Sequence, residues 1–398
     1  MLPNSDILNK AQYVVGDVKT VLNMPDVKPL SPFSDEALDF LNALSRRLIK
    51  SRGFSDVSTF GFWCRKQHLL GEKEKYPDCS ARLGRGIIFH STPSNVAVNF
   101  AFSFAAGLIA GNANIVRLPA KSFEQVDIIC STVNELLDGE FSCMKPYAAM
   151  LKFPPDRSLY NEFSAMCDTR VIWGGDNTIA ELRQSQLPPR ANEITFADRF
   201  SAVMINCGEY LKSENKSRIA QDFYNDTYLT DQNACTSPRI IFWYGENAEE
   251  AKDIFWKEFR VVSEAQYELT PVQAVGKLHA LYKAASQENI SLLPHTDNLI
   301  TRIKVHNITS TLMDYKYNSG FFYEYDISDL EEIRPVFDKK CQTLSYIGFD
   351  KNNLREQIMS LKPLGIDRIV PVGKTMDFAL IWDGVDLIRT MSRYIDCV

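Results

Sequence analysis

The sequence predicts an α/β protein with two parallel-sheet units, and three observations support this prediction. Its 398 residues exceed the roughly 250 to 300 residues at which a single hydrophobic core stops growing. Hydrophobic residues make up 45% and charged residues 24% of the chain, which is typical of globular proteins rather than of disordered or fibrous ones. From about residue 84 onward, short apolar runs alternate with longer helical patterns, as in βαβ units.

The part of the chain before this alternation has a different pattern. Residues 1–82 carry amphipathic helical repeats, and in residues 35–50 (DEALDFLNALSRRLIK) the apolar side chains recur every three or four positions. This spacing places them on one face of a helix. We therefore expect a helical region that serves as packing scaffold.

The first predicted sheet starts with a strand at residues 86–90 (GIIFH). The next segment, residues 96–110, is almost wholly apolar and predicts a buried helix. Together with the N-terminal helical region, this sheet defines a first domain of residues 1–206. Its other elements are expected at residues 114–118 (strand), 122–137 (helix), 170–173 (strand) and 202–206 (strand).

A second alternation begins after Cys207 and predicts a second domain of residues 207–385, followed by a C-terminal segment of residues 386–398. The loop 228–238 lies between a helix and an apolar strand of this domain. The expected elements are a helix at 214–227, a strand at 239–244, long helices up to 289, strands near 299–306, 320–325 and 342–347, and a helix near 353–361.

Charge and targeting signals narrow the class of protein. The net charge of -6 is small, and no run of Lys and Arg could neutralise a phosphate backbone. The N-terminal text lacks a basic region followed by an apolar one. The apolar segment 96–110 is shorter than the roughly 20 residues that span a bilayer. We expect a cytoplasmic protein that is not an integral membrane protein and does not bind nucleic acid.

Metal-binding patterns are not found in the sequence. The nine cysteines are scattered without a CxxC pair, and the five histidines show neither HxxxH nor HExxH spacing. Such spacings are what bring two ligands together on one element. We therefore expect no metal site and no disulfide framework, with most cysteines as free thiols.

One cysteine stands in a setting that suits chemistry. The loop 230–238 (TDQNACTSP) places Cys235 among small and polar residues just before an apolar strand, so its thiol should be reachable. A cysteine acts as a nucleophile in its thiolate form, which nearby backbone N–H groups or a helix N-terminus would favour. The alternative is an ordinary polar loop with a half-buried thiol.

Three separated segments resemble one known family. They are the loop around Cys235, residues 84–122 (GRGIIFHSTPSNVAVNFAFSFAAGLIAGNANIVRLPAKS) and residues 365–384 (GIDRIVPVGKTMDFALIWDG). Together, and in this order, they resemble the long-chain acyl-CoA reductase (LuxC) family of the aldehyde dehydrogenase superfamily, over roughly residues 80–390. The resemblance implies an aldehyde dehydrogenase-like fold with two Rossmann-like domains, one for the cofactor and one for the catalytic thiol, and an active-site cleft between them.

The resemblance assigns catalytic roles to two residues. Cys235 matches the nucleophile that forms a thioester with the substrate carbon. Asn95 matches the side-chain amide that forms an oxyanion hole with the backbone N–H of the cysteine. Asn95 would serve equally well as the N-cap of a helix that begins at Val96.

The same resemblance implies a nicotinamide cofactor in the first domain. Gly174 and Gly175 match a strand-to-helix turn near the nicotinamide and pyrophosphate, where glycine lets the backbone approach the cofactor. Any βα turn can use glycine, however. Lys121 stands about where hydrolytic relatives carry a glutamate that holds the ribose, and Arg117 lies nearby. Two cations would suit a 2′-phosphate, so we expect NADPH, with NADH possible. The alternative for both is a solvated strand end.

A second departure from hydrolytic relatives concerns water activation. The glutamate that activates water there corresponds to Thr195 here, and Glu193 lies two residues away. Without a well-placed base, water should attack a thioester slowly, whereas exchange with coenzyme A stays available. In the late segment, Lys374 and Trp382 are best explained as a turn residue and a core residue.

The function expected from this resemblance is NADPH-dependent reduction of an acyl-CoA, most simply a fatty acyl-CoA, to an aldehyde through acyl-Cys235. The expected partners are the acyl-CoA substrate, an acyl-activating synthetase or acyl carrier, and further copies of the chain in a homo-oligomer. Two alternatives stay open: an acylphosphate or semialdehyde enzyme on the same fold, and a non-catalytic scaffold.

Overall fold

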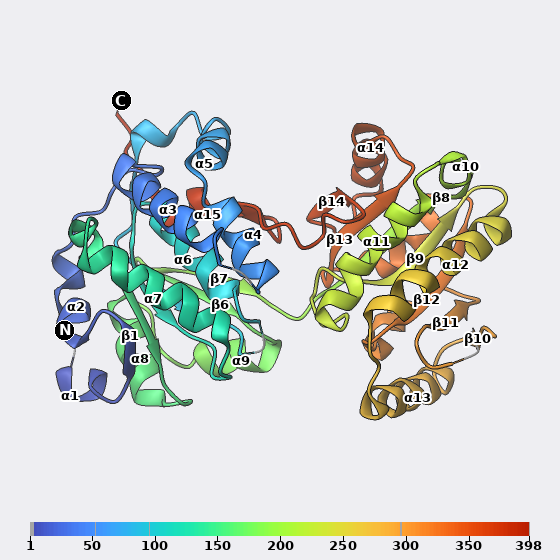
Figure 1. Cartoon of the computed structure of the whole chain (residues 1–398), viewed down its shortest axis with the longest axis horizontal. Coiled ribbons are helices and arrows are strands. Elements are labelled where there is room, and N and C mark those ends of the chain that lie inside the picture. Colours follow the sequence, from blue (N-terminus) through green and yellow to red (C-terminus); the bar gives the residue numbers. More distant parts are fainter. Residues whose placement is uncertain (1–3, 52, 95, 295–296, 398) are drawn as a thin grey trace. The chain divides into compact units, whose positions relative to one another are not determined.

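The structure is a computed structural model that describes residues 4–51, 53–94, 96–294 and 297–397. Contacts divide the chain into two compact units, which are described separately (Figure 1). Unit 1 comprises Met1–Ala197 and Phe378–Val398, and unit 2 comprises Asp198–Asp377. The chain therefore leaves unit 1, completes unit 2 and returns to unit 1.

These limits differ from the predicted domain boundaries at residues 206 and 385. Strand β8 (Phe200–Asn206) belongs to unit 2, because it pairs in parallel with β9 (Pro238–Tyr244) and β13 (Cys341–Ile347). Residues from Phe378 onward belong to unit 1. There, the Phe378 carbonyl accepts a hydrogen bond from the indole N–H of Trp63 at 3.2 Å.

Unit 1 contains a six-stranded sheet in the order β1-β5-β4-β3-β6-β7, in which only β1 is antiparallel to its neighbour. Both faces are covered, as is usual for parallel sheets. Ile88 packs into one hydrophobic core, whereas its neighbours Ile87 and Phe89 pack into the other, as strand alternation requires. The strands are β1 (Gln12–Val15), β3 (Ile87–Ser91), β4 (Ala113–Arg117), β5 (Ala148–Lys152), β6 (Thr169–Trp173) and β7 (Asn192–Phe196).

The helices of unit 1 supply the partners of these two cores. The long helices α3, α6 and α7 contribute to the core that contains Ile88, and the shorter α2 and α8 to the core that contains Phe89. Helix α6 is buried along most of its length, as predicted for the apolar segment 96–110. The helix bounds are α1 (Ser5–Leu8), α2 (Val18–Asn23), α3 (Asp35–Leu48), α4 (Ser55–Trp63), α5 (Lys66–Lys73), α6 (Asn99–Ile109), α7 (Glu124–Asp138), α8 (Arg157–Met166) and α9 (Asp176–Leu182).

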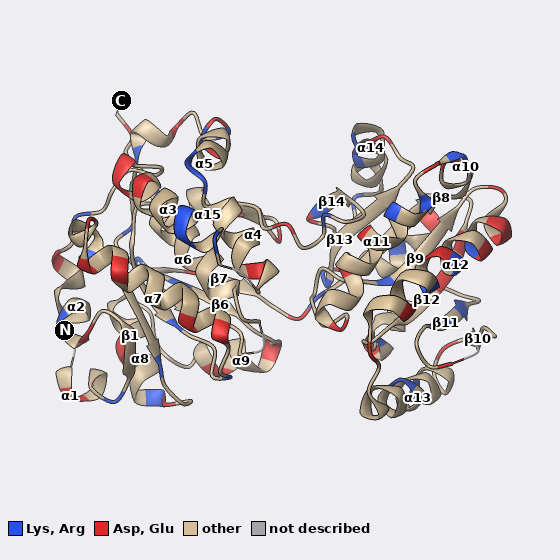
Figure 2. Ribbon diagram, in the orientation of Figure 1, with Lys and Arg blue, Asp and Glu red and all other residues tan. Residues whose placement is uncertain are grey.

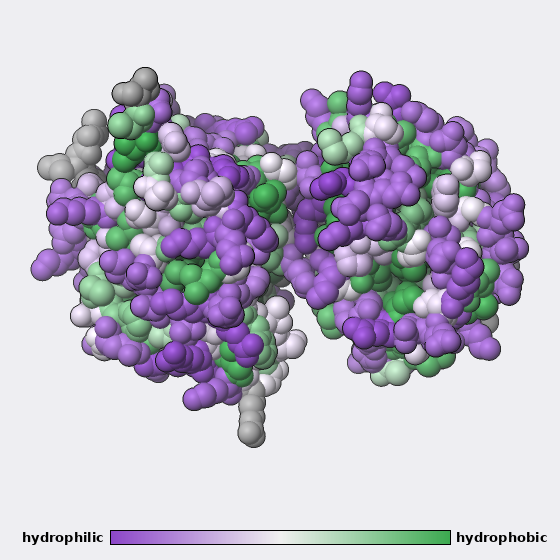
Figure 3. Space-filling model, turned by 90° about the horizontal axis from the view of Figure 1, so that it is seen from above, coloured by the Kyte–Doolittle hydropathy of each residue, from purple (hydrophilic) through white to green (hydrophobic). Residues whose placement is uncertain are grey.

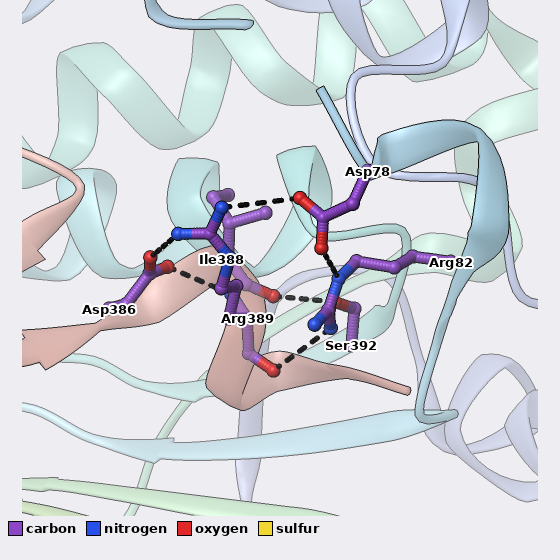
Figure 4. Close-up of polar contacts among 6 residues, drawn as sticks. All are labelled: Asp78, Arg82, Asp386, Ile388, Arg389 and Ser392. Carbon is purple, nitrogen blue, oxygen red and sulfur yellow. Dashed lines mark hydrogen bonds and ion pairs between the residues drawn. The ribbon is translucent and has the colours of Figure 1, made fainter. Parts of the chain in front are cut away.

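The C-terminal segment forms part of unit 1, not a separate tail (Figure 4). Strand β17 (Ser392–Tyr394) pairs antiparallel with β2 (Arg82–Gly84). Asp78 accepts hydrogen bonds from Arg82 at 2.7 Å and from Arg389, in α15 (Leu387–Met391), at 3.2 Å. The Arg389–Asp78 contact and a further hydrogen bond between Arg82 and Ser392 join residues that are 311 and 310 positions apart in the sequence. A short hairpin of β15 (Ile381–Trp382) and β16 (Val385–Asp386) precedes α15.

Unit 2 contains a seven-stranded sheet in the order β10-β11-β12-β9-β8-β13-β14, in which only β10 is antiparallel. Helices α13 and α14 pack on one face, and α10, α11 and α12 on the other. The further bounds are β10 (Ile290–Leu292), β11 (Thr301–Val305), β12 (Phe321–Ile327), β14 (Arg368–Pro371), α10 (Cys207–Lys212), α11 (Lys216–Thr227), α12 (Ala248–Gln266), α13 (Pro271–Ala285) and α14 (Lys351–Leu361).

The surface of each unit is mixed in charge and polarity. Acidic and basic residues are interspersed over both units (Figure 2), and on the face seen in Figure 3 apolar side chains lie in small groups among hydrophilic ones. Within the described part of the chain, no helix combines the length and apolar character needed to cross a bilayer.

Candidate active site

Cys235 differs from the other eight cysteines in its exposure. Cys143 and Cys397 are exposed, six cysteines are buried, and Cys235 alone is of intermediate exposure. Burial raises the pKa of each of the six buried thiols, which keeps them in the unreactive protonated form. The buried thiols are those of Cys64, Cys79, Cys130, Cys167, Cys207 and Cys341.

The Cys235 loop, defined as residues 231–237, is held in place by Gln232. Asp231 and Gln232 both adopt left-handed backbone conformations, with φ of 50° and 58°, which turn the chain away from the preceding helical segment. The Gln232 side chain is fully buried. Its amide nitrogen donates to the carbonyl oxygen of Pro238 at 2.9 Å, and its oxygen accepts from the N–H groups of Gly320 and Phe321 at 2.9 and 3.0 Å. One side chain thus joins the loop to β9 and β12.

Two further contacts fix the loop around the cysteine itself. The hydroxyl of Ser201, in β8, donates to the Cys235 carbonyl at 2.8 Å. The hydroxyl of Thr236 donates to the sulfur of Met376 at 3.2 Å. Because Cys235 precedes β9 and Ser201 lies near the start of β8, the thiol sits at the amino edge of the unit 2 sheet.

Arg239, four positions after Cys235, is a buried cation. Burial lowers the pKa of Arg239 to about 10, although the charges of Asp198 and Cys235 raise it. Its guanidinium donates to the carbonyl of Tyr317, while its Nε is buried and has no hydrogen-bond partner among the described residues. Arg239 and Cys235 therefore interact electrostatically, and a cation near a thiol favours the nucleophilic thiolate. The sequence analysis did not single out Arg239.

The predicted cofactor residues gather at the carboxyl edge of the unit 1 sheet. Strand β3 lies between β4 and β6, so that Ser91 pairs with Arg117 on one side and with Ile172 on the other. Gly174 follows directly after β6. The strand order reverses between β3 and β6, and ligands of open α/β sheets bind at such a switch point.

The turn after β6 presents bare backbone. Gly175 has φ of -65° and ψ of 167°, a conformation open to any residue, and no atom lies within 4 Å of the place where its Cβ would be. Neither the backbone nor the packing of the described residues therefore requires glycine at position 175. The open space suits a ligand that approaches the backbone closely. At Gly174 a Cβ would come within 3.2 Å of Thr178.

The two predicted cations differ in their surroundings. The guanidinium of Arg117 lies 5.1 Å from the ring centroid of Phe153 and 5.6 Å from that of Tyr160, and it donates to the Phe153 carbonyl at 3.3 Å. Lys121 is exposed, with its ammonium 5.3 Å from the ring of Phe123. Asn95, the other predicted catalytic residue, lies outside the described residues.

Glu193 is the carboxylate nearest in sequence to the position expected to activate water, and it is engaged in ion pairs. Both oxygens of Glu193 form ion pairs, with Arg170 at 2.5 Å and with Arg183 at 2.7 Å. Thr195 follows two residues later in the same strand, β7. Both oxygens of the Glu193 carboxylate are therefore engaged by guanidinium groups of unit 1.

A buried polar network, which the sequence analysis missed, lies near the carboxyl edge of the unit 1 sheet. His90, in β3, is fully buried, and burial lowers its pKa to about 4. Its Nε2 lies 3.0 Å from the Asn114 side-chain oxygen, and its Nδ1 lies 2.8 Å from the Ser103 hydroxyl. Ser103 also accepts a hydrogen bond from the indole of Trp173 at 2.9 Å. The neutral imidazole therefore helps to anchor the residue that precedes Gly174.

No three His, Cys, Asp or Glu side chains of the described segments lie close enough together to hold a metal ion.

Comparison with solved structures identifies the fold. The chain is similar to an NAD-dependent benzaldehyde dehydrogenase from Corynebacterium glutamicum (10% identity, 92% of this chain, 85% of that chain, TM-score 0.61). It is also similar to a methylmalonate-semialdehyde dehydrogenase from Oceanimonas doudoroffii (10%, 94%, 88%, 0.61) and to aldehyde dehydrogenase 21 from Physcomitrella patens (11%, 94%, 87%, 0.60). The fold is therefore that of the aldehyde dehydrogenase superfamily.

Comparison with family models identifies the family of the protein. The acyl-CoA reductase (LuxC) model matches residues 24–264, which is more than half of the chain. The protein therefore belongs to the acyl-CoA reductase (LuxC) family, whose reactions concern acyl and aldehyde groups. The match includes part of the N-terminal region, although the sequence resemblance was expected to begin only near residue 80. No curated protein matches this sequence.

Proposed function

We propose that this protein reduces an acyl-CoA thioester to an aldehyde through a covalent acyl-Cys235 intermediate. The observation that carries the proposal is the setting of Cys235, a thiol of intermediate exposure in a loop fixed by Gln232 and coupled to the buried cation of Arg239. These are the features that a nucleophilic cysteine needs.

The first half of the reaction follows from this setting. The Cys235 thiolate adds to the acyl carbonyl, and the sulfur–carbon bond to coenzyme A breaks, so that the acyl group passes to the enzyme and coenzyme A leaves as its thiol after taking up a proton. The Asn95 side chain and the Cys235 backbone N–H are the proposed donors to the oxyanion. One such donor commonly contributes on the order of a hundredfold in rate.

The proposed cofactor is NADPH, held at the switch point of the unit 1 sheet. The space at Gly175 allows a close approach of the pyrophosphate, and Arg117 and Lys121 are the proposed partners of the adenosine 2′-phosphate. When bound, the reduced nicotinamide supplies the hydride that converts the thioester to the aldehyde. The protein holds the acyl carbonyl at Cys235, and the Cys235 thiolate is the leaving group when the aldehyde forms.

A reductase is favoured over an acid-forming dehydrogenase by the surroundings of Glu193. Both oxygens of Glu193 are engaged in ion pairs. The carboxylate is therefore not available to take a proton from water, and water attack on acyl-Cys235 should be slow. We further propose that the acyl group is a fatty acyl group, supplied by a synthetase or an acyl carrier. The protein is proposed to be a cytoplasmic homo-oligomer.

The test is oxidation of NADPH with a series of acyl-CoA esters from short to long chains. We expect release of free coenzyme A and thioester-dependent oxidation that vanishes in Cys235→Ala and persists in the matched control Cys143→Ala, which removes an exposed cysteine. Oxidation that survives the loss of Cys235 would overturn the mechanism. Activity with acyl phosphates but not with acyl-CoA would favour the alternative enzyme class.

A further inference from the structure

Asp226 is a buried carboxyl group for which the proposed reaction has no use. It lies near the end of α11, nine positions before Cys235 in the sequence, and is 1% exposed. Its two oxygens accept hydrogen bonds from the N–H groups of Gly373, at 2.6 Å, and Thr375, at 3.2 Å. These partners are 147 and 149 positions away in the sequence. The carboxyl group therefore joins two distant segments of unit 2.

The segment that it joins to α11 is the 372–377 loop, defined as residues 372–377. The loop approaches the helix so closely that a Cβ on Gly373, whose φ is +89°, would come within 2.8 Å of the Asp222 side chain. On the other side, the guanidinium of Arg368 donates to the carbonyls of Thr375 and Asp377, both at 2.9 Å. The loop is thus held at its amide groups by Asp226 and at its carbonyls by Arg368.

The 372–377 loop also contacts the Cys235 loop directly. Met376 accepts the hydrogen bond from the hydroxyl of Thr236, the residue after the thiol. A change in the position of this loop therefore changes what lies beside the nucleophile.

We propose that Asp226 is a positioning residue for Cys235, which holds the 372–377 loop against the Cys235 loop, and that one proton on its carboxyl group adjusts how firmly the loop is held. The proposal deepens the proposed function, because it assigns a control point to the same thiol. No contact between Asp226 and the substrate is implied.

The direction of the proton effect follows from burial. Burial is the main reason that the pKa of Asp226 rises to about 6, and the N–H groups of Gly373 and Thr375 only partly offset it. Release of the loop would expose the carboxyl group to water and return its pKa toward the ordinary value near 4. Because the held state binds the proton more tightly, protonation favours that state. The loop should be held most firmly below about pH 6 and less firmly at neutral pH.

The elements that Asp226 joins carry further charged groups. On its own helix, Asp222 raises the pKa of Asp226, and Arg218 lies 3.8 Å from Asp222. On the loop, Lys374 and Asp377 pair with each other at 3.1 Å. Arg368, on β14, is directed to the loop carbonyls. The charge of Asp222 raises the pKa of Asp226, so that its removal should lower the midpoint.

The first measurement is hydrogen exchange of the Gly373 and Thr375 amides in the full chain, corrected for intrinsic rates, from pH 5 to pH 8. We expect protection in the wild type to fall by roughly tenfold across this range, which corresponds to the loss of about one hydrogen bond. In the matched control Asp222→Asn, the fall should occur at lower pH. Protection that is constant or that rises with pH would overturn the proposal.

The second measurement is the rate of alkylation of Cys235 by iodoacetamide, read at the peptide level. Asp226→Ala removes both acceptors, so that Cys235 should react several-fold faster than in the wild type at pH 5.5, and the ratio should shrink toward pH 8. Asp226→Asn keeps one acceptor without the charge and should restore slow alkylation at every pH. Equal rates in all three proteins would contradict the proposal.

Neither measurement requires an acyl thioester or NADPH. If the proposed reductase activity were absent, the two readouts would still report on Asp226, and if Asp226→Ala failed to fold, the exchange profile of the wild type would decide the matter. Failure of the positioning role and failure of the proposed function are therefore distinguishable.

Discussion

The two candidate sites are constructed differently, although each belongs to a parallel sheet. In unit 2, the Cys235 loop is fixed by its own buried side chains, chiefly by Gln232. In unit 1, the turn at Gly175 leaves open space where a side chain would be. A substitution in the Cys235 loop should therefore change stability and activity together. A substitution at the glycine turn should change cofactor affinity alone.

The strongest test of this comparison is Gln232→Ala. The substitution removes four hydrogen bonds in a buried place, so that we expect a loss of about 3 kcal/mol in the free energy of unfolding and loss of most activity. Denaturant unfolding and the NADPH assay measure the two effects. Gln357→Ala, on an exposed part of α14, is the matched control, and an unchanged midpoint in Gln232→Ala would refute the anchoring role.

Acid should affect the two units in opposite directions. The pKa of His90 is about 4 when folded, below the ordinary 6.5, so that its stabilising effect is complete above pH 6.5 and is lost as the pH falls. The pKa of Asp226 is raised to about 6, so that its effect is complete below the ordinary 3.8 and is lost as the pH rises.

From pH 7 to pH 5, we therefore expect unit 1 to lose about 2 kcal/mol and unit 2 to gain about 1 kcal/mol. Hydrogen exchange of the core amides of β3 and β9 measures the two units separately. Equal destabilisation of both strands would show that other groups control the acid response.

The role of the buried cation is tested by Arg239→Met. Without the guanidinium, the thiolate of Cys235 loses its electrostatic partner, and alkylation by iodoacetamide at pH 7 should slow by roughly tenfold. Arg355→Met, which removes an exposed cation of α14, should leave the rate unchanged. A Cys235 that reacts as fast in Arg239→Met as in the wild type would exclude this role.

At the unit 1 site, Gly175→Val fills the open space beside the turn. We expect KM for NADPH to rise by roughly tenfold, since a β-branched side chain obstructs close approach to the backbone. The melting temperature should fall only slightly, because the added Cβ meets no neighbour and the substitution affects only the N-cap of α9. Gly71→Val, at another glycine without neighbours in α5, controls for the substitution itself. Loss of stability without a change in KM would reverse the comparison.

The smallest expected effect is that of Lys121→Glu. Lys121 is exposed, so that solvent screens its charge. We expect the preference for NADPH over NADH to fall by about fivefold, because a carboxylate repels the 2′-phosphate and accepts hydrogen bonds from the ribose hydroxyls. Lys50→Glu, another exposed lysine of unit 1, should not alter the preference, and a proportional change in both variants would point to a general charge effect.

The sequence predicted most of the central strands of the two sheets, because apolar runs define them. β3, β4, β6, β9 and β12 lie within about two residues of their expected positions. Among the strands that were missed, β5 lies inside the unit 1 sheet, whereas β1, β7, β10 and β14 lie at sheet edges. Gln12–Val15 is an edge strand with only one fully buried side chain, and Asn192–Phe196 alternates polar with apolar residues in a polar context.

The domain boundary could not be located for a similar reason. β8 follows β7 after three residues, and only pairing with β9 and β13 shows that it starts the second sheet. Cys235 could be singled out because its loop has an unusual composition. Arg239 and Asp226 could not, since a charged residue in a strand or helix gives no local sign that the fold will bury it.

The return of the chain to unit 1 has a consequence for synthesis. Unit 2 is one continuous stretch, whereas unit 1 needs β17 and the Arg389–Asp78 contact from residues that follow unit 2 in the sequence. Chains fold while they leave the ribosome, usually from the N-terminal end. Here the unit that is translated first is completed only after unit 2 has been made, so a nascent chain must carry unit 1 without its β2–β17 pair while unit 2 is synthesised.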